Sequence, residues 1–205
     1  MTTEAKTSNQ TKRTLLIVSF ILLYVAVSLP ILLSPSPEWT DSLVRFCALA
    51  GFTSLFLSTV LSAFTREVYK IFSRPFMGVH HIFAVAGMIL ITIHPLTLAV
   101  VSLDLTVFIP DVSSLDAFLA LGGRAAIYLF YIALVGAFAR RVVPKYWRFI
   151  HGLVYVGLVL AYVHGLLIGT DFANPFVSVL FTVMLAASFL VLLYRRYLTW
   201  KRKMR

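Results

Sequence analysis

Long apolar stretches separated by short polar segments make up most of this chain. A helix of about 20 apolar residues is long enough to cross the roughly 30 Å hydrocarbon core of a bilayer. The first stretch is longer than the apolar part of a secretory signal and lacks a clear small-x-small cleavage site, so we interpret it as a span. The pattern predicts an all-α fold, an integral membrane bundle whose six transmembrane helices cover residues 14–33, 43–64, 76–103, 118–139, 149–169 and 176–194.

The composition supports this assignment. Hydrophobic residues make up 60% of the 205 residues, against about 45–50% in soluble domains. We divide the chain into a cytoplasmic N-terminal tail at 1–13, a six-helix transmembrane domain at 14–195 and a basic cytoplasmic tail at 196–205. Cys47 is the single cysteine, which excludes a disulfide framework or a cysteine metal site within the chain.

The net charge of +10 is distributed as a topology signal rather than as a surface for nucleic acid. Of the 18 Lys and Arg residues, 16 lie in the two tails, the second loop and the fourth loop. Arg45 and Arg124 lie on the other side, together with six of the eight acidic residues. The positive-inside rule therefore predicts that both termini are cytoplasmic, a parity that six spans satisfy. We expect a multi-pass protein of the plasma membrane, in contact with the lipid bilayer and with no nucleic-acid partner.

All five histidines fall on the third and fifth predicted spans, which run in the same direction. His80 and His151 define an inner pair near the basic end, and His94 and His164 define an outer pair. Helical rise separates the two levels by about 20 Å. Helical phase favours His80 over its neighbour His81 as the partner of His94, because fourteen residues bring two side chains back to nearly the same face. The thirteen-residue spacing of the other two ligand candidates implies an angle of about 140°, which phase alone does not accommodate.

Histidines inside membrane spans usually face the bundle and are functional. Two matched imidazole pairs indicate bis-imidazole ligation of heme iron at two levels. A zinc site fits less well, since it would gather its ligands at one level with carboxylates or thiolates. The rival hypothesis is a non-redox membrane transporter, or a proton relay, that uses the histidines to move protons or metal ions.

Two segments resemble a known family. They are Arg74-Pro75 leading into His80 with His94-Pro95 fourteen residues on, and Trp147-Arg148-Phe149-Ile150-His151 with Tyr155 and His164. Over about residues 45–195 the chain resembles the ferric reductase-like transmembrane domain superfamily. That superfamily includes ferric reductases, the membrane part of NADPH oxidases and the heme-binding subunit of the periplasmic methionine sulfoxide reductase system.

The resemblance implies heme b between the third and fifth spans, with two hemes favoured and one heme typical of the sulfoxide-reductase subunit. It implies His80, His94, His151 and His164 as the axial ligands, with His81 as the alternative to His80, and it assigns no catalytic side chain. It also implies a membrane heme subunit of an oxidoreductase that carries electrons to an extracytoplasmic acceptor or partner protein. Because little sequence follows the sixth span, we expect the donor to be a quinol, a separate flavin reductase, or FMN or FAD at the cytoplasmic face.

Two basic residues precede the candidate inner ligands. Arg74 and Arg148 enter the third and fifth spans a few residues before them, where they are candidates to pair with heme propionates or with acids of a docking partner. Positive-inside signalling explains their positions equally well.

Arg45 and Arg124 lie just inside the outer ends of their spans, near the expected level of the outer pair. A guanidinium is suited to a carboxylate, so both are candidates for the propionates of an outer heme or for attracting an anionic acceptor. The alternative is pairing with Asp41, Asp104 or Asp116, or snorkelling to the interface.

Overall fold

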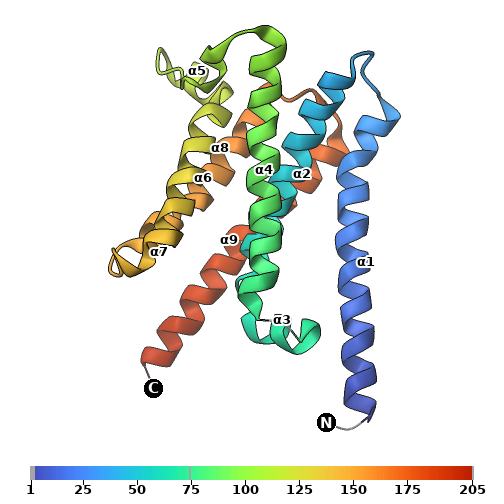
Figure 1. Cartoon of the computed structure of the whole chain (residues 1–205), viewed down its shortest axis with the longest axis vertical. Coiled ribbons are helices and arrows are strands. Elements are labelled where there is room, and N and C mark those ends of the chain that lie inside the picture. The colour runs from blue at the N-terminus through green and yellow to red at the C-terminus, as the bar shows by residue number, and fades with distance from the viewer. Residues whose placement is uncertain (1–2, 74, 205) are drawn as a thin grey trace.

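The structure, a computed structural model, describes residues 3–73 and 75–204 and consists of helices joined by short connections. The helices run alternately up and down, so that α1 begins and α9 ends at the same end of the bundle (Figure 1). This arrangement confirms the predicted all-α membrane bundle. Among the described residues, the helices long and apolar enough to cross a membrane are Asn9–Leu33, Trp39–Leu61, Met77–Ser102, Gly122–Arg141, Trp147–Ile168 and Pro175–Lys203.

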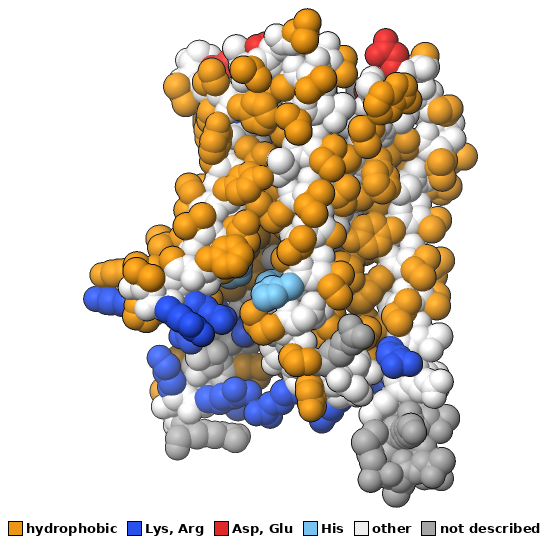
Figure 2. Space-filling view, in the orientation of Figure 1, with side chains coloured by type: hydrophobic (Ala, Val, Ile, Leu, Met, Phe, Trp, Pro, Cys, Tyr) orange, Lys and Arg blue, Asp and Glu red, His pale blue; other side chains and the backbone are white. Residues whose placement is uncertain are grey.

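The two ends of the bundle differ in charge. Figure 2 shows Lys and Arg side chains gathered at one end, with Asp and Glu at the opposite end and hydrophobic side chains between them. We call the basic end inner and the acidic end outer. The apolar belt between them is the surface that would contact lipid.

The first half of the chain forms α1 (Thr3–Leu33), α2 (Trp39–Leu61), α3 (Thr65–Phe72) and α4 (Phe76–Ser102). The helix α1 begins well before the predicted span, because the polar tail contains neither Gly nor Pro to stop it. The connector between the second and third spans is not irregular but forms α3, a short amphipathic helix that buries Val68.

The predicted fourth span is interrupted near its outer end. It consists of α5 (Leu115–Ala120) and α6 (Gly122–Phe138), joined at Leu121 and followed by the short η2 (Ala139–Arg141). Two consecutive glycines open α6, and glycine favours helix ends over helix interiors.

The predicted fifth span is also interrupted, at Gly152, between α7 (Trp147–His151) and α8 (Leu153–Ile168). The break comes directly after His151. The angle of about 140° calculated for His151 and His164 on one straight helix therefore does not apply. After η3 (Thr170–Ala173), α9 (Pro175–Lys203) continues nine residues past the predicted end of the sixth span into the basic tail.

The spans assemble as two antiparallel helix pairs. The helix α2 packs along α4, and α6 packs along α8, whereas α4 and α6 barely touch. Gly51 and Gly87 allow the first pair to approach closely, because a Cβ at either position would lie 2.8 Å from a side chain of the facing helix. The helices α1 and α9 pack against α2, and the histidines lie between the two helix pairs.

Candidate functional site

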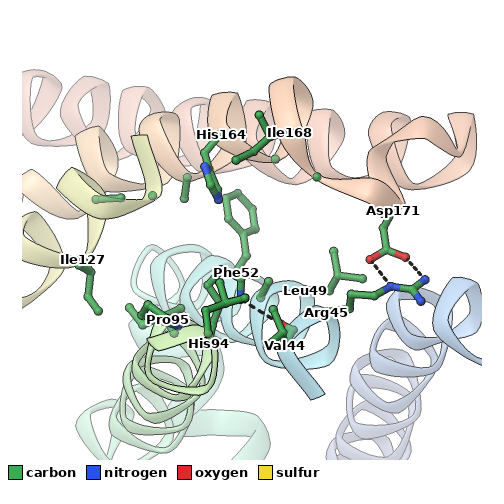
Figure 3. Close-up of a pocket in the computed structure, with 18 of the residues that line it drawn as sticks. Val44, Arg45, Leu49, Phe52, His94, Pro95, Ile127, His164, Ile168 and Asp171 are labelled. Atoms are coloured by element: carbon green, nitrogen blue, oxygen red, sulfur yellow. Dashed lines mark hydrogen bonds and ion pairs between the residues drawn. The ribbon is translucent and has the colours of Figure 1, made fainter. Parts of the chain in front are cut away.

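The histidines meet in twos at the two predicted levels. In the inner pair, the ring centroids of His80 and His151 are 6.4 Å apart and the ring planes cross at 72°. In the outer pair, His94 and His164 project from helices on opposite sides of one cavity of about 370 Å³ (Figure 3). All four side chains are half-buried.

The helix α2 provides a hydrogen-bond acceptor for His80 and for His94 of α4. The Nδ1–H of His94 donates to the Val44 carbonyl at 3.0 Å, and the Nδ1–H of His80 donates to the Ser58 carbonyl at 3.2 Å. The two carbonyls are fourteen residues apart in sequence, as are the two histidines. Antiparallel packing therefore places each imidazole opposite a carbonyl of the same neighbouring helix.

The fourth span provides hydrogen-bond acceptors for the two histidines of the fifth span. The Nδ1–H of His164 donates to the Ala120 carbonyl at 2.7 Å, and that of His151 donates to the Ala133 carbonyl at 3.1 Å. Both the histidines and the carbonyls are thirteen residues apart. The break between α5 and α6 frees the outer carbonyl, because the Arg124 amide donates to Leu121 instead.

These contacts determine the tautomer. A carbonyl can only accept a hydrogen bond, so each Nδ1 carries the hydrogen and the lone pair is on Nε2. A neutral imidazole whose Nδ1–H is held by a backbone carbonyl is the usual form of a metal-ligating histidine, since the second contact fixes the orientation of the ring. The arrangement occurs four times, once for each predicted ligand.

A glycine next to the outer carbonyl makes room for the imidazole. Gly123 lies three residues after Ala120, and a Cβ there would be 3.0 Å from Cδ2 and 3.1 Å from Nε2 of His164. An alanine at this position would press on the ring.

The inner carbonyl, that of Ala133, also has a glycine three residues later. Gly136 lies three residues after Ala133, and a Cβ there would be 2.5 Å from Cγ2 of Ile150 and 3.4 Å from the backbone nitrogen of His151. The pattern Ala-x-x-Gly thus occurs twice in the fourth span, thirteen residues apart. Sequence reasoning missed the carbonyls and the outer glycine, although this repeat, matching the histidine spacing, was a detectable signal.

The outer cavity is mostly apolar with a charged end. Leu49, Phe52, Pro95 and Ile127 are among its lining residues (Figure 3). Its volume and its few polar groups are typical of sites that hold a small molecule or a cofactor.

The charged end contains an ion pair that the sequence did not predict. Arg45 donates from Nε to Oδ2 of Asp171 at 3.1 Å and from a terminal nitrogen to Oδ1 at 2.6 Å. The two side chains are 13% and 6% exposed. For Arg45 the acidic partner is therefore none of the three acids considered as alternatives, Asp41, Asp104 and Asp116. The actual partner lies in η3, far along the chain, where local sequence gives no indication of its proximity.

Arg124 also lines the outer cavity, and its prediction as a propionate partner stays a prediction. It is half-buried, and one terminal nitrogen donates to the Ile109 carbonyl at 3.0 Å. Hydrogen bonds from Thr106, and to a smaller extent the charge of Arg124, lower the pKa of Asp104 in the adjoining outer loop. This rim is therefore a mixed-charge surface with an arginine on the cavity wall.

The remaining candidates lie at the inner end. Arg148 is exposed and its guanidinium carbon is 5.5 Å from the centre of the Trp147 ring. His81 is exposed, with its ring centroid 5.8 Å from that of His80. Arg74 lies outside the described residues.

Two imidazoles that face each other from different helices are a donor set that could hold a heme iron between them. Among the described residues, no group of three or more His, Cys, Asp or Glu side chains gathers around a point. The inner pair brings two imidazole rings from different helix pairs together, with 6.4 Å between their centroids. The outer pair offers a cavity, and arginine is the side chain best suited to the carboxylates that heme carries.

Comparisons with protein-family models, with curated proteins and with solved structures find no match to this chain. The resemblance to the ferric reductase-like transmembrane domain therefore rests on the motifs quoted above.

Proposed function

We propose that this chain is a membrane-bound b-type cytochrome that carries electrons across a membrane. His80 and His151 hold one heme, and His94 and His164 hold a second. The observation that carries the proposal is the set of four half-buried imidazoles, paired across the bundle, each with Nδ1 bound to a backbone carbonyl of a neighbouring helix.

Heme iron supplies a one-electron carrier, and the protein supplies ligands, orientation and electrostatics. The carbonyls of α2 and of the fourth span hold the imidazoles in one tautomer and one orientation. The side chains that line the outer cavity are mostly apolar, which lowers the local dielectric around a bound cofactor. The two levels are about 20 Å apart along the bundle, so together they cover most of the hydrocarbon thickness.

The direction follows from charge. The positive-inside rule favours a cytoplasmic location for the basic inner end and for both termini, and we propose the plasma membrane as the location. The donor is then a cytoplasmic-side flavoprotein or a quinol, and the acceptor is extracytoplasmic. A ferric-reductase-like activity and service to a sulfoxide reductase partner both agree with this direction, and the resemblance supports either.

The test is spectroscopic. The full chain, expressed with ample heme and purified in detergent, should be red, with a low-spin b-type spectrum that changes on reduction by dithionite. Heme extraction should give two hemes per chain. Colourless, heme-free protein would overturn the proposal and favour the transporter or proton-relay hypothesis, whereas one heme per chain would restrict the function to one level.

A further inference from the structure

A serine hydroxyl contacts one of the four ligand candidates. Oγ of Ser58 lies 2.8 Å from Nδ1 of His80, while the carbonyl of the same residue lies 3.2 Å from that nitrogen. Ser58 is 4% exposed, in the interior of the bundle. The Nδ1–H thus points at two oxygens of one residue.

The other three imidazoles have a carbonyl alone at Nδ1 among the hydrogen bonds of the described residues. Most hydroxyls inside these helices bond back to a carbonyl of their own helix. Ser54, one turn earlier on α2 and also buried, donates to the Ala50 carbonyl at 2.7 Å and contacts the Tyr24 hydroxyl at 2.6 Å. Ser58 is directed instead at an imidazole on α4.

We propose that Ser58 is a positioning residue that lowers the reduction potential of the heme held by the inner pair. This inference rests on the proposed function. A second acceptor on Nδ1–H draws the hydrogen away from the ring and makes Nε2 a stronger electron donor to a bound metal. A stronger donor stabilises ferric iron relative to ferrous iron and so makes reduction less favourable.

The consequence is a direction for electron transfer. The inner pair lies beside a hydroxyl acceptor, whereas the outer cavity has Arg124 on its wall, beside the Arg45–Asp171 ion pair, whose two charges offset each other. Positive charge favours the reduced, less positive form of a nearby heme. Ser58 and Arg124 therefore act in the same sense, and electrons move downhill from the inner level to the outer level.

The experiment is a redox titration of the full-length, heme-loaded protein in detergent, followed by its visible spectrum. The inner component is identified as the one that disappears in His151→Ala. In Ser58→Ala the inner heme should become easier to reduce by about fivefold in equilibrium constant, the effect of one hydrogen bond of about 1 kcal/mol. This change equals about 40 mV for a one-electron couple. Ser58→Thr keeps the hydroxyl and should restore the wild-type value.

Ser54→Ala is the matched control, because it removes a buried hydroxyl of the same helix that contacts no histidine. An unchanged inner potential in Ser58→Ala, or an equal shift in Ser54→Ala, would overturn the role of Ser58. If Ser58→Ala loses the inner heme, Ser58→Cys is titrated in its place: a raised potential supports the role and a wild-type potential refutes it. Heme-free wild-type protein would overturn the proposed function as well, which separates the two failures.

Discussion

The inner and outer histidine pairs are held by the same device. In each pair one imidazole binds a carbonyl of α2 and the other binds a carbonyl of the fourth span. The carbonyl spacings of fourteen and thirteen residues equal the histidine spacings on the facing helices. Within each helix pair, a single antiparallel register therefore sets both levels, because the register that aligns the inner histidine with its carbonyl also aligns the outer histidine.

The surroundings of the two pairs differ. The outer pair adjoins a cavity whose charged end contains a nearly buried ion pair. The inner pair has a serine hydroxyl, a nearby Trp147 and an exposed arginine at the membrane boundary. The placement of the imidazoles thus depends on backbone groups common to both levels, whereas the polar side chains around them are specific to each level.

Removal of a ligand should break one level and leave the other. His151→Ala should lose the inner heme and His164→Ala the outer heme, so that each retains about half of the wild-type heme. The reason is that the two levels have no ligand in common. Heme extraction from the purified variants measures this loss, and His94→Ala should behave like His164→Ala.

The exposed neighbour of the inner ligand is the control for these substitutions. His81→Ala should retain wild-type heme content, while His80→Ala should lose the inner heme, because only the latter ring lies against His151. Loss of inner heme in His81→Ala alone would show that the inner ligand was wrongly chosen.

Gly123 and Gly136 test whether the close packing around each histidine of the fifth span affects only its own level. Gly123→Ala should disturb the outer heme and Gly136→Ala the inner heme, since overpacking of this kind costs about 1–3 kcal/mol. We expect heme affinity at the affected level to fall by about 10-fold or more. Heme titration of the apoprotein provides the measurement.

Gly78→Ala is the matched substitution, because a Cβ at Gly78 would meet nothing within 4 Å even though the residue lies close to His80 in sequence. It should bind heme as the wild type does. Equal losses of heme affinity in all three variants would mean that general helix packing, and not the space that Gly123 and Gly136 leave beside the histidines, limits heme binding.

The number and the approximate bounds of the membrane spans could be predicted from the sequence. The six spans follow from apolar length, and the bounds of α4 agree with the predicted 76–103 to within one residue. The breaks at Leu121 and Gly152 were not predicted, because an apolar stretch has the same hydropathy whether or not its helix is interrupted. The pairing of Arg45 with Asp171 depends on how the outer ends of distant helices meet, and hydropathy carries no information on that contact.

The ion pair between Arg45 and Asp171 should stabilise the fold at the outer end of the bundle. Arg45→Gln or Asp171→Asn leaves a nearly buried charge without its partner, a change that costs about 3 kcal/mol or more. Both variants should therefore unfold at lower temperature, and the double variant should recover part of the loss. Loss of the heme absorbance band on heating provides the readout.

The same two substitutions should shift the outer heme potential in opposite directions. Removal of the positive charge of Arg45 should lower it, and removal of the negative charge of Asp171 should raise it, with the inner potential unchanged. Shifts of the same sign in both variants would indicate a general structural change instead of an electrostatic effect.

The smallest effect is expected from a comparison of one arginine at each level. Arg124 is half-buried on the wall of the outer cavity, whereas Arg148 is exposed and lies over Trp147. Exposed charges are screened by salt and contribute little. Arg124→Gln should therefore lower the outer potential in both low and high salt, while Arg148→Gln should lower the inner potential or slow reduction by the donor in low salt alone. Redox titration and stopped-flow reduction at two ionic strengths measure both quantities. If Arg148→Gln shifted the inner potential equally at both ionic strengths, the arginine would contact the inner heme directly, and the two levels would be alike in charge as well as in their ligands.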